Sequence, residues 1–396
     1  MGDGIYHPFL HMVAEKHMMD PKKKYQLFKQ NNNFCTCPWT NAQIYTNGDV
    51  KTCSIGTEVL GNVNESDILE ILTKSNTLKR IRTNMLNDTP DPNCVVCQYR
   101  SIDDDNFVYL KDHYNSRIKN DDVDYDDIEN FDLRFIDLHW SNICNLRCVM
   151  CHPEQSSLIA KDENFITTPV NQKNIKKIRE MIIKNQTRLK EIYLSGGEPF
   201  YIPYNFTLLE EISNKDIPIR VNSNMHWQQN NKVFKALLKF KNVQLTMSVD
   251  ALNEKFGYIR NGADWNTFTK NLEFVKTHTN FDIRINTIFS IINAIDICNL
   301  IKYFFAKDIR DITINLCTTP SPIDARNYPK NKKSKIVGAI LDLIKTMSPD
   351  NVNLISNLKN CINRLQLDNE GSYEDCLDQI TRKHKISWRS VFKDLI

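Results

Sequence analysis

The sequence predicts an α/β fold in which six strand–helix units form a partial, open barrel. Strand-like and helix-like segments alternate between residues 133 and 316, an order typical of parallel sheets with helices outside them. Six units are fewer than the eight of a closed barrel, so we expect an open (βα)6 arrangement. In such folds the chemistry lies at the C-terminal ends of the strands, and functional motifs are expected there.

Hydrophobic periodicity predicts each element of this barrel. The expected strands alternate apolar and polar residues or are short apolar runs, and the expected helices carry apolar residues on one face. In chain order we expect strand 133–140, helix 174–185, strand 189–194, helix 208–212, strand 217–222, helix 233–238, strand 243–249, helix 268–275, strand 283–289, helix 295–305 and strand 312–316.

Three further segments flank the predicted core at 133–320. Residues 1–120 contain five cysteines and are expected to form a small N-terminal domain. Residues 121–132 are dense in acid and are expected to form a solvated linker. Residues 321–396 contain amphipathic stretches and are expected to form a helical C-terminal extension. Packing over the open side of the barrel is its expected role, with partner binding as the alternative.

Composition narrows the compartment and the partners. The chain has 396 residues, of which 41% are hydrophobic, so it can bury a large core. A net charge of +3 gives no electrostatic reason to expect a nucleic-acid partner. No apolar run reaches the ~18 residues of a membrane span, so we expect a cytoplasmic protein without a membrane partner. Twelve cysteines in a reducing compartment indicate metal or cluster ligands rather than disulfides.

Three cysteines follow the first predicted strand of the barrel. The stretch "CNLRCVMC" places Cys144, Cys148 and Cys151 on one loop. Such short spacings let three thiolates bind three corners of a [4Fe-4S] cluster and leave the fourth iron open to another ligand. The alternatives are chance or a zinc site completed by His152. Structural zinc usually takes four ligands arranged as separated pairs, which this run does not supply.

A glycine-rich turn follows the second predicted strand. The stretch "LSGGEPF" contains Gly196, Gly197, Glu198 and Pro199. Two glycines allow the backbone to approach a ligand closely, and the glutamate can accept hydrogen bonds from an ammonium group. A Gly-Gly turn is common by itself, but here it follows the cysteine loop by one strand–helix unit.

Together these motifs resemble the radical S-adenosylmethionine (radical SAM) superfamily over residues 133–316. The resemblance implies that the three cysteines hold a [4Fe-4S] cluster whose open iron binds S-adenosylmethionine. It also implies that Gly196, Gly197 and Glu198, followed by Pro199, contact the amino group of that cofactor. Weaker matches at later strand ends imply further cofactor contacts, although each can also be a turn, a helix cap or an ion pair. These are Asn222, Ser248, Asp250 and Arg260.

The N-terminal cysteines predict a second site. A hairpin signal "NGD" lies between Cys37 and Cys53, and "CVVC" contributes Cys94 and Cys97. Four thiols can hold zinc or a fully ligated iron–sulfur cluster. The pattern resembles the SPASM and twitch auxiliary-cluster domains of radical SAM enzymes, which implies these four residues as ligands, with Cys35 as a competitor for the first place. Such domains commonly follow the barrel, whereas this one precedes it.

The resemblance implies a radical SAM enzyme. S-adenosylmethionine would be cleaved reductively to a 5′-deoxyadenosyl radical that abstracts hydrogen from a substrate, with an electron supplied by flavodoxin or ferredoxin. The auxiliary cluster is expected to accept an electron from the product radical, with substrate binding through an open iron as the alternative. A peptide or protein side chain is the expected substrate. Modification of RNA or a small metabolite is the alternative, together with a non-catalytic iron–sulfur or zinc electron-transfer module, which would not require "GGEP".

Overall fold

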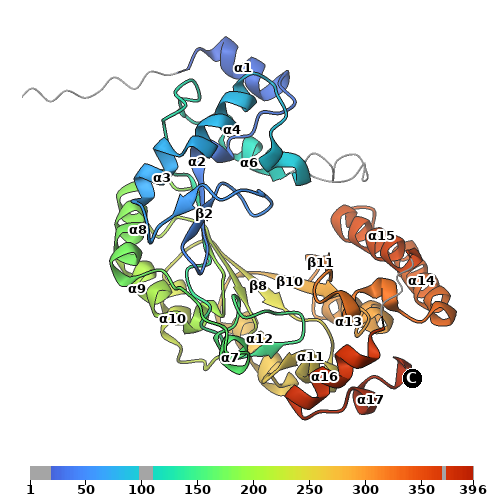
Figure 1. Cartoon of the computed structure of the whole chain (residues 1–396). Helices are drawn as coiled ribbons and strands as arrows, with labels where there is room; N and C mark the ends of the chain where they lie inside the picture. Colours follow the sequence, from blue (N-terminus) through green and yellow to red (C-terminus); the bar gives the residue numbers. More distant parts are fainter. Residues whose placement is uncertain (1–18, 98–109, 368–371, 396) are drawn as a thin grey trace, which may run out of the picture.

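The computed structural model describes residues 19–97, 110–367 and 372–395. The remaining parts of the predicted N-terminal and C-terminal segments lie outside the described residues. A curved sheet occupies the centre, helices of the barrel cover its outer side, and the N-terminal and C-terminal helices lie at separate ends of the molecule (Figure 1). Within the described residues, no helix is long and apolar enough to cross a membrane.

The six predicted barrel strands are confirmed as neighbours in one parallel sheet. In the described residues nine strands form this sheet, in the order β11-β10-β8-β7-β6-β4-β1-β2-β3. The barrel strands are β4 (Phe135–Leu138), β6 (Glu191–Leu194), β7 (Ile219–Ser223), β8 (Val243–Ser248), β10 (Asp282–Phe289) and β11 (Ile312–Leu316). Because each strand pairs in parallel with the next, all six C-terminal ends meet at one edge of the sheet.

Helices connect these strands, as the alternating pattern predicts. The connecting helices are α7 (Ser157–Asp162), α8 (Gln172–Asn185), η2 (Pro199–Tyr201), α9 (Pro203–Glu211), α10 (Lys232–Leu237), α11 (Asn253–Ile259), α12 (Trp265–His278), η3 (Ala294–Asp296) and α13 (Ile297–Ala306). Side-chain caps begin several of them: Asn171, Asn231 and Asp264 each accept from the backbone N–H three residues later. The helix expected at 208–212 begins earlier because Pro203 occupies its first turn.

The N-terminal cysteine-rich segment joins the barrel through its sheet. Its strands are β1 (Asn41–Ile44), β2 (Asp49–Lys51) and β3 (Gly61–Asn62). Strand β1 pairs in parallel with β4, with Asn41 opposite Phe135 and Ile44 opposite Leu138. Around these strands lie α1 (Pro21–Lys29), α2 (Cys37–Thr40), α3 (Ile68–Lys74), α4 (Asn76–Leu86), η1 (Pro92–Cys94) and α6 (Leu110–Ile118). The N-terminal hairpin therefore extends the barrel sheet beyond its first strand.

The acidic segment 121–132, expected to be a solvated linker, is partly core. Tyr125 is fully buried and meets the rings of Phe34 and Trp39 edge-on. Asp132 is also buried and forms ion pairs with Arg134 and Arg188. The prediction of a solvated linker rested on the many acidic residues of this segment. It overlooked the apolar residues among them and the arginines that pair with several of the acids.

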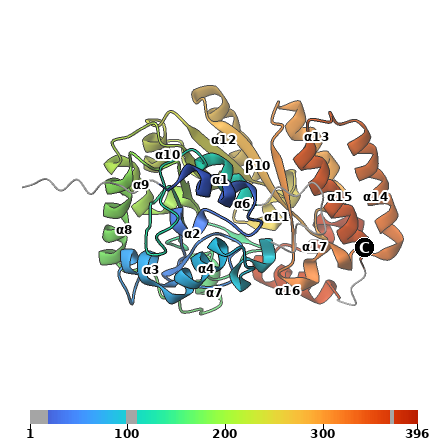
Figure 2. The ribbon, with the colours of Figure 1, turned by 90° about the horizontal axis from the view of Figure 1, so that it is seen from above.

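The C-terminal helices cover the other edge of the barrel. They are α14 (Lys330–Lys345), α15 (Val352–Gln366), α16 (Glu374–His384) and α17 (Trp388–Val391), with short 3-10 turns before and after them at η4 (Ser321–Ile323), η5 (Ala325–Asn327) and η6 (Lys393–Leu395). Asn357 of α15 accepts from the backbone N–H of Ile314 in β11 at 2.8 Å. Seen from above, α14 and α15 stand beside α13 at this edge (Figure 2).

Candidate active site and auxiliary thiol site

The loop after β4 carries Cys144, Cys148 and Cys151. Its backbone is fixed at several points: Ser157 Oγ accepts from the Cys144 N–H at 3.2 Å, and the Cys151 N–H donates to the Cys148 carbonyl at 3.0 Å. Strand β5 (Arg147–Cys148) pairs with β9 (Arg260–Asn261), which follows α11. The three thiols are thus held on a structured loop at the C-terminal edge of the sheet.

These thiols face a cavity that opens to solvent. Nine of the predicted cluster and cofactor residues line it, from the cysteine loop and from the ends of β6, β7, β8 and α11. They are Cys144, Cys148, Cys151, Gly196, Gly197, Glu198, Asn222, Ser248 and Arg260. The structure therefore brings together, in one cavity, residues that the sequence spreads over more than a hundred positions.

The two glycines lie directly against the cysteine loop. Gly196 has φ = +100°, and a Cβ atom there would lie 2.6 Å from the Ser141 carbonyl oxygen. A Cβ atom on Gly197 would lie 2.2 Å from the Ile143 carbonyl oxygen. In the same place the Glu198 N–H donates to Ile143 O at 2.8 Å. Only glycine allows this approach, so the Gly-Gly pair joins the second strand end to the thiol loop.

Glu198 is buried at the cavity wall and is held by three donors. Its carboxylate accepts from Ser223 Oγ at 2.9 Å, from the Asn224 N–H at 2.8 Å and from the Phe200 N–H at 3.3 Å. Burial raises the pKa of Glu198 to about 7, and these hydrogen bonds oppose the rise. An ammonium group in the cavity would pair with the ionised form.

Arg260 faces the cluster loop. Its guanidinium donates to Cys148 Sγ at 3.7 Å and forms an ion pair with Asp250 Oδ2 at 2.9 Å. Asp250 is fully buried, and its other oxygen accepts from the Ile288 N–H at 2.8 Å. Asp250 thus lies behind Arg260 and not on the cavity wall. Pro199 is also buried and begins the 3-10 turn η2, so both residues support the cavity from outside its lining.

The environment of the three thiols disfavours charge when no metal is bound. Burial raises the pKa of Cys151 to about 12 and also raises the pKa values of Cys144 and Cys148. Arg260 opposes the rise at Cys148. Thiolates are the form that binds iron, so cluster insertion at this loop must release protons.

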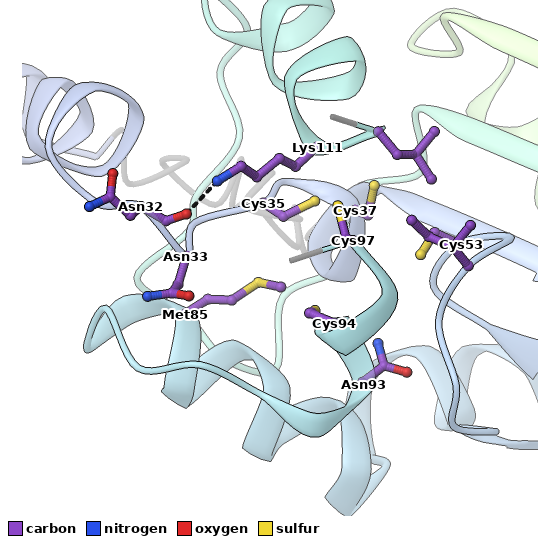
Figure 3. Close-up of a pocket in the computed structure, with 12 residues that line it drawn as sticks. Asn32, Asn33, Cys35, Cys37, Cys53, Met85, Asn93, Cys94, Cys97 and Lys111 are labelled. Carbon is purple, nitrogen blue, oxygen red and sulfur yellow. Dashed lines mark hydrogen bonds between the residues drawn. The ribbon is translucent and has the colours of Figure 1, made fainter. Parts of the chain in front are cut away.

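A second cavity lies in the N-terminal segment. Among the described residues, five cysteine side chains are arranged around it: Cys35, Cys37, Cys53, Cys94 and Cys97 (Figure 3). Cys37 begins α2, Cys53 follows β2, and Cys94 ends η1. The structure brings together all four predicted ligands and their competitor Cys35.

Both thiol sets suit a multinuclear iron–sulfur group. Each offers soft sulfur donors on the wall of a cavity, the chemistry that such clusters require. Within the described residues, no three His, Cys, Asp or Glu side chains converge tightly enough to hold a single metal ion.

The two thiol sets lie toward opposite ends of the barrel. Cys37 precedes β1, whose start pairs with the start of β4, whereas Cys144 follows the end of β4. A third, small cavity is lined by Cys53, Asp137 and Tyr193. Tyr193 also lines the cavity of the barrel thiols. The interior of the barrel therefore connects the surroundings of the two sites.

Sequence reasoning missed a polar cluster on the inner face of the barrel. His139 Nε2 lies 3.0 Å from Asp137 Oδ1, and the His139 ring stacks on Tyr45 with centroids 5.5 Å apart. Gln43 donates to Asp137 Oδ2 at 2.9 Å, and Ser195 donates to Asp137 Oδ1 at 3.2 Å. The signal was the alternation of polar residues in "FIDLH", which places Asp137 and His139 on the face opposite Ile136 and Leu138.

Two family comparisons define the class of this protein. Residues 138–295 match the radical SAM superfamily, and residues 35–98 match the SPASM iron–sulfur cluster-binding domain. Residues 138–295 are therefore a radical SAM domain, and a SPASM domain precedes it in the chain. The cofactors of this class are a [4Fe-4S] cluster with S-adenosylmethionine and an auxiliary iron–sulfur cluster.

Particular relatives are distant. The chain is 23% identical over 172 residues to molybdenum cofactor biosynthesis protein 1 of Dictyostelium discoideum, covering 42% of this chain and 26% of that protein. A structure of anSMEcpe with bound AdoMet has a TM-score of 0.41 at 17% identity, over 53% of this chain and 59% of that one. Streptococcus suis SuiB bound to its precursor peptide SuiA has a TM-score of 0.38 at 16% identity, over 52% and 45%.

Proposed function

We propose that this protein binds S-adenosylmethionine at a [4Fe-4S] cluster and cleaves it reductively to a 5′-deoxyadenosyl radical, which removes a hydrogen atom from a substrate. One observation carries this proposal: the three loop thiols, the Gly-Gly turn and buried Glu198 share one cavity at the C-terminal ends of the strands. In barrel folds the active site lies at the C-terminal ends of the strands, where this cavity is found.

The chain's own residues supply position and charge. Cys144, Cys148 and Cys151 would hold the cluster, and Glu198 would accept the ammonium group of the cofactor. Arg260 donates to Cys148 Sγ, so it stabilises negative charge at the cluster ligand. Asn222 and Ser248, at the ends of β7 and β8, offer polar contacts to the rest of the cofactor. No protein acid or base is assigned to the cleavage.

We propose a peptide or protein side chain as the substrate. The cavity is lined mainly by neutral hydrogen-bonding groups, such as Tyr193, Asn222 and Asn286. Among the described residues of its lining, Arg260 is the one Lys or Arg, and it is already paired with Asp250. RNA binding relies on Lys and Arg contacts to phosphates, so this lining favours a peptide over RNA. A small metabolite remains a candidate that a substrate screen would detect.

The auxiliary cluster is proposed to accept an electron from the product radical. Two features support this role. Several thiols enclose the cavity, so protein sulfurs can ligate every iron of the cluster and none needs to bind the substrate. The barrel interior also lies between the two sites. We further propose a one-electron reductant of the flavodoxin or ferredoxin kind and a reducing compartment such as the cytoplasm. Replacing Cys94 should then lower product yield and leave the first cluster intact.

The test of the proposed function is anaerobic. The protein is reconstituted with iron and sulfide, reduced in the presence of S-adenosylmethionine, and assayed for 5′-deoxyadenosine. Cleavage should disappear in Cys148→Ala and persist in the control Cys376→Ala, which removes a thiol outside both cavities. If the protein without substitutions holds its full iron complement and still forms no 5′-deoxyadenosine, the result would favour the non-catalytic electron-transfer module.

A further inference from the structure

The outer side of the cysteine loop forms one surface with α7 and the end of α16. Strand β5 consists of Arg147 and Cys148, whose side chains point to opposite sides because successive strand residues alternate. Cys148 lines the cavity, whereas Arg147 forms an ion pair with Asp162 of α7. The next residue, Glu163, pairs with Lys383 of α16 at 2.8 Å. Figures 1 and 2 show α7 and α16 side by side. We call the surface around these two ion pairs the α7–α16 face.

The α7–α16 face carries an excess of positive charge. Its charged groups, counted together with the exposed Glu154 of the cysteine loop, are five cations and three acids, a net charge of +2. They are Arg147, Lys161, Arg382, Lys383 and Lys385, and Glu154, Asp162 and Glu163. The whole chain has a net charge of only +3. Within the described residues, Lys161, Arg382 and Lys385 are exposed and form no ion pair, so their charge is available to a partner.

Exposed apolar side chains lie in the same segments. Phe165 and Ile166 follow Glu163 closely and are 44% and 90% exposed. Ile386 follows Lys383 by three positions and is 38% exposed. Exposed apolar side chains among charged ones are typical of surfaces that bind another protein.

The end of α16 is held in place by its own contacts. The ring of His384 meets the ring of Tyr258 in α11 edge-on, with centroids 6.1 Å apart. Beyond the helix, the buried Trp388 donates its backbone N–H to Thr381 Oγ1 at 3.1 Å. The face is therefore formed before any partner arrives, which reduces the entropic cost of binding.

A second basic run lies at the other thiol site, but acids offset it. In α1, Lys23 pairs with Asp126, and Lys24 donates to the backbone carbonyl of Asp121. The segment 121–132 that supplies these partners contains seven acidic residues and no Lys or Arg. An acidic protein would be repelled there, whereas the α7–α16 face would attract it.

We propose that an acidic one-electron carrier protein of the flavodoxin kind docks on the α7–α16 face and passes its electron directly to the cluster of the barrel thiols. The reduced carrier loses one electron and the cluster gains it, and no bond forms or breaks. Strand β5 would lie between the two, with Arg147 toward the carrier and Cys148 toward the cluster. This inference rests on the cluster and the reductant of the proposed function, but not on the cleavage of S-adenosylmethionine.

The experiment compares two matched charge reversals in the reconstituted full-length protein. Lys161→Glu with Lys385→Glu changes the α7–α16 face, and Lys22→Glu with Lys29→Glu makes the same change on α1. Binding of a flavodoxin with a strongly acidic surface is measured anaerobically by surface plasmon resonance, at low and at high ionic strength. Formation of 5′-deoxyadenosine is then followed with reduced flavodoxin and, separately, with dithionite, a small reductant that needs no docking surface. Iron content and circular dichroism check each variant.

The face variant should bind flavodoxin with an association rate constant lower by about tenfold at low ionic strength, because electrostatic attraction becomes repulsion. The difference should shrink at high ionic strength, where exposed charges are screened. Cleavage driven by flavodoxin should slow in parallel, while cleavage driven by dithionite stays the same. The α1 variant should behave like the protein without substitutions.

Three results would overturn the docking surface. They are unchanged flavodoxin binding in the face variant, an equal loss of binding in the α1 variant, and an equal loss of dithionite-driven cleavage in the face variant, which would place the defect in the cluster. Absence of 5′-deoxyadenosine with both reductants would instead contradict the proposed cleavage, and the binding measurement would still decide where the carrier docks.

Discussion

Glu198 is the residue whose charge we propose to control cofactor binding in this cavity. Its pKa is raised to about 7 by burial, so the free protein holds much of this carboxyl group in the neutral form below that pH. The neutral acid cannot pair with an ammonium group, and ionisation restores the pairing as the pH rises.

The affinity of the reconstituted protein for S-adenosylmethionine should therefore rise between about pH 6 and pH 8, following the pKa of Glu198. The dissociation constant can be measured by equilibrium dialysis under anaerobic conditions. Glu198→Gln should bind more weakly and lose most of this pH dependence. An affinity that rises equally steeply in the glutamine variant would assign the titration to another group.

Arg82 is a second residue with a testable role, in stability. It is fully buried in α4 and donates to three backbone carbonyls, at 2.6 Å to Pro38, 2.6 Å to Ile128 and 3.1 Å to Leu72. These bonds tie together the helix that begins with Cys37, the acidic segment and α3.

Arg82→Met should lower the free energy of unfolding by about 3 kcal/mol, because buried carbonyls lose their donors. Denaturant unfolding of the metal-free protein measures this. The exposed Arg310, whose ion pair with Asp308 is 3.5 Å long, provides the control, and Arg310→Met should change stability by less than about 0.5 kcal/mol. Equal effects of the two changes would contradict the role of Arg82.

At the scale of elements, the Gly-Gly turn after β6 and the cysteine loop after β4 form one unit. Gly197→Ala would bring a Cβ atom against backbone that cannot swing away, and it should cost about 1–3 kcal/mol and reduce iron binding at the loop. Gly338 in α14 has no atom within 4 Å of the corresponding position, so Gly338→Ala should stabilise the protein by up to about 1 kcal/mol. The unfolding temperature and the iron content of both variants should be measured. Gly338→Ala shows the effect of alanine where there is space, so the difference between the two variants gives the effect of crowding at Gly197.

At the same scale, some features of the fold and the site could be predicted from the sequence and others could not. The six strands and the two motifs at their ends were predictable because periodicity and spacing are local properties. The contact of Arg260 with the sulfur of Cys148 was not, since it depends on β9 returning to pair with β5. Asp137 and His139 were overlooked for a related reason. Their partner Gln43 lies on β1 and their partner Tyr45 directly follows it, and the sequence did not identify the neighbour of that strand.

At the scale of the whole molecule, the pairing of β1 with β4 makes the SPASM domain and the barrel share one sheet. Backbone bonds extend this junction on both sides, from the Arg134 N–H to Thr40 O and from the His139 N–H to Ile44 O, each 2.8 Å long. Composition suggested separable parts, because the acidic run resembles a linker. The sheet shows instead that the parts share hydrogen bonds and core.

Calorimetry of the metal-free protein should therefore show one cooperative transition for both parts. Ala42→Pro, in the middle of β1, should lower the transition temperature and split it in two, since proline removes a donor from an interior strand. Ile166→Pro, at a 90% exposed loop position, is the control and should leave a single transition. Two transitions in the unchanged chain would mean that the shared sheet does not couple the parts.

The order of these parts along the chain also has a consequence for synthesis. The hairpin of β1 and β2 leaves the ribosome before its neighbour β4, which follows Asn41 by about ninety residues. During that interval one side of β1 presents unpaired backbone groups, a surface open to wrong pairing. The thiols of the hairpin emerge in the same interval, and Cys94 and Cys97 follow before β4 is made. If the auxiliary cluster were inserted at this stage, it would fix the N-terminal segment in its folded form before β4 is synthesised. Insertion of this cluster would then be coupled to correct assembly of the barrel sheet.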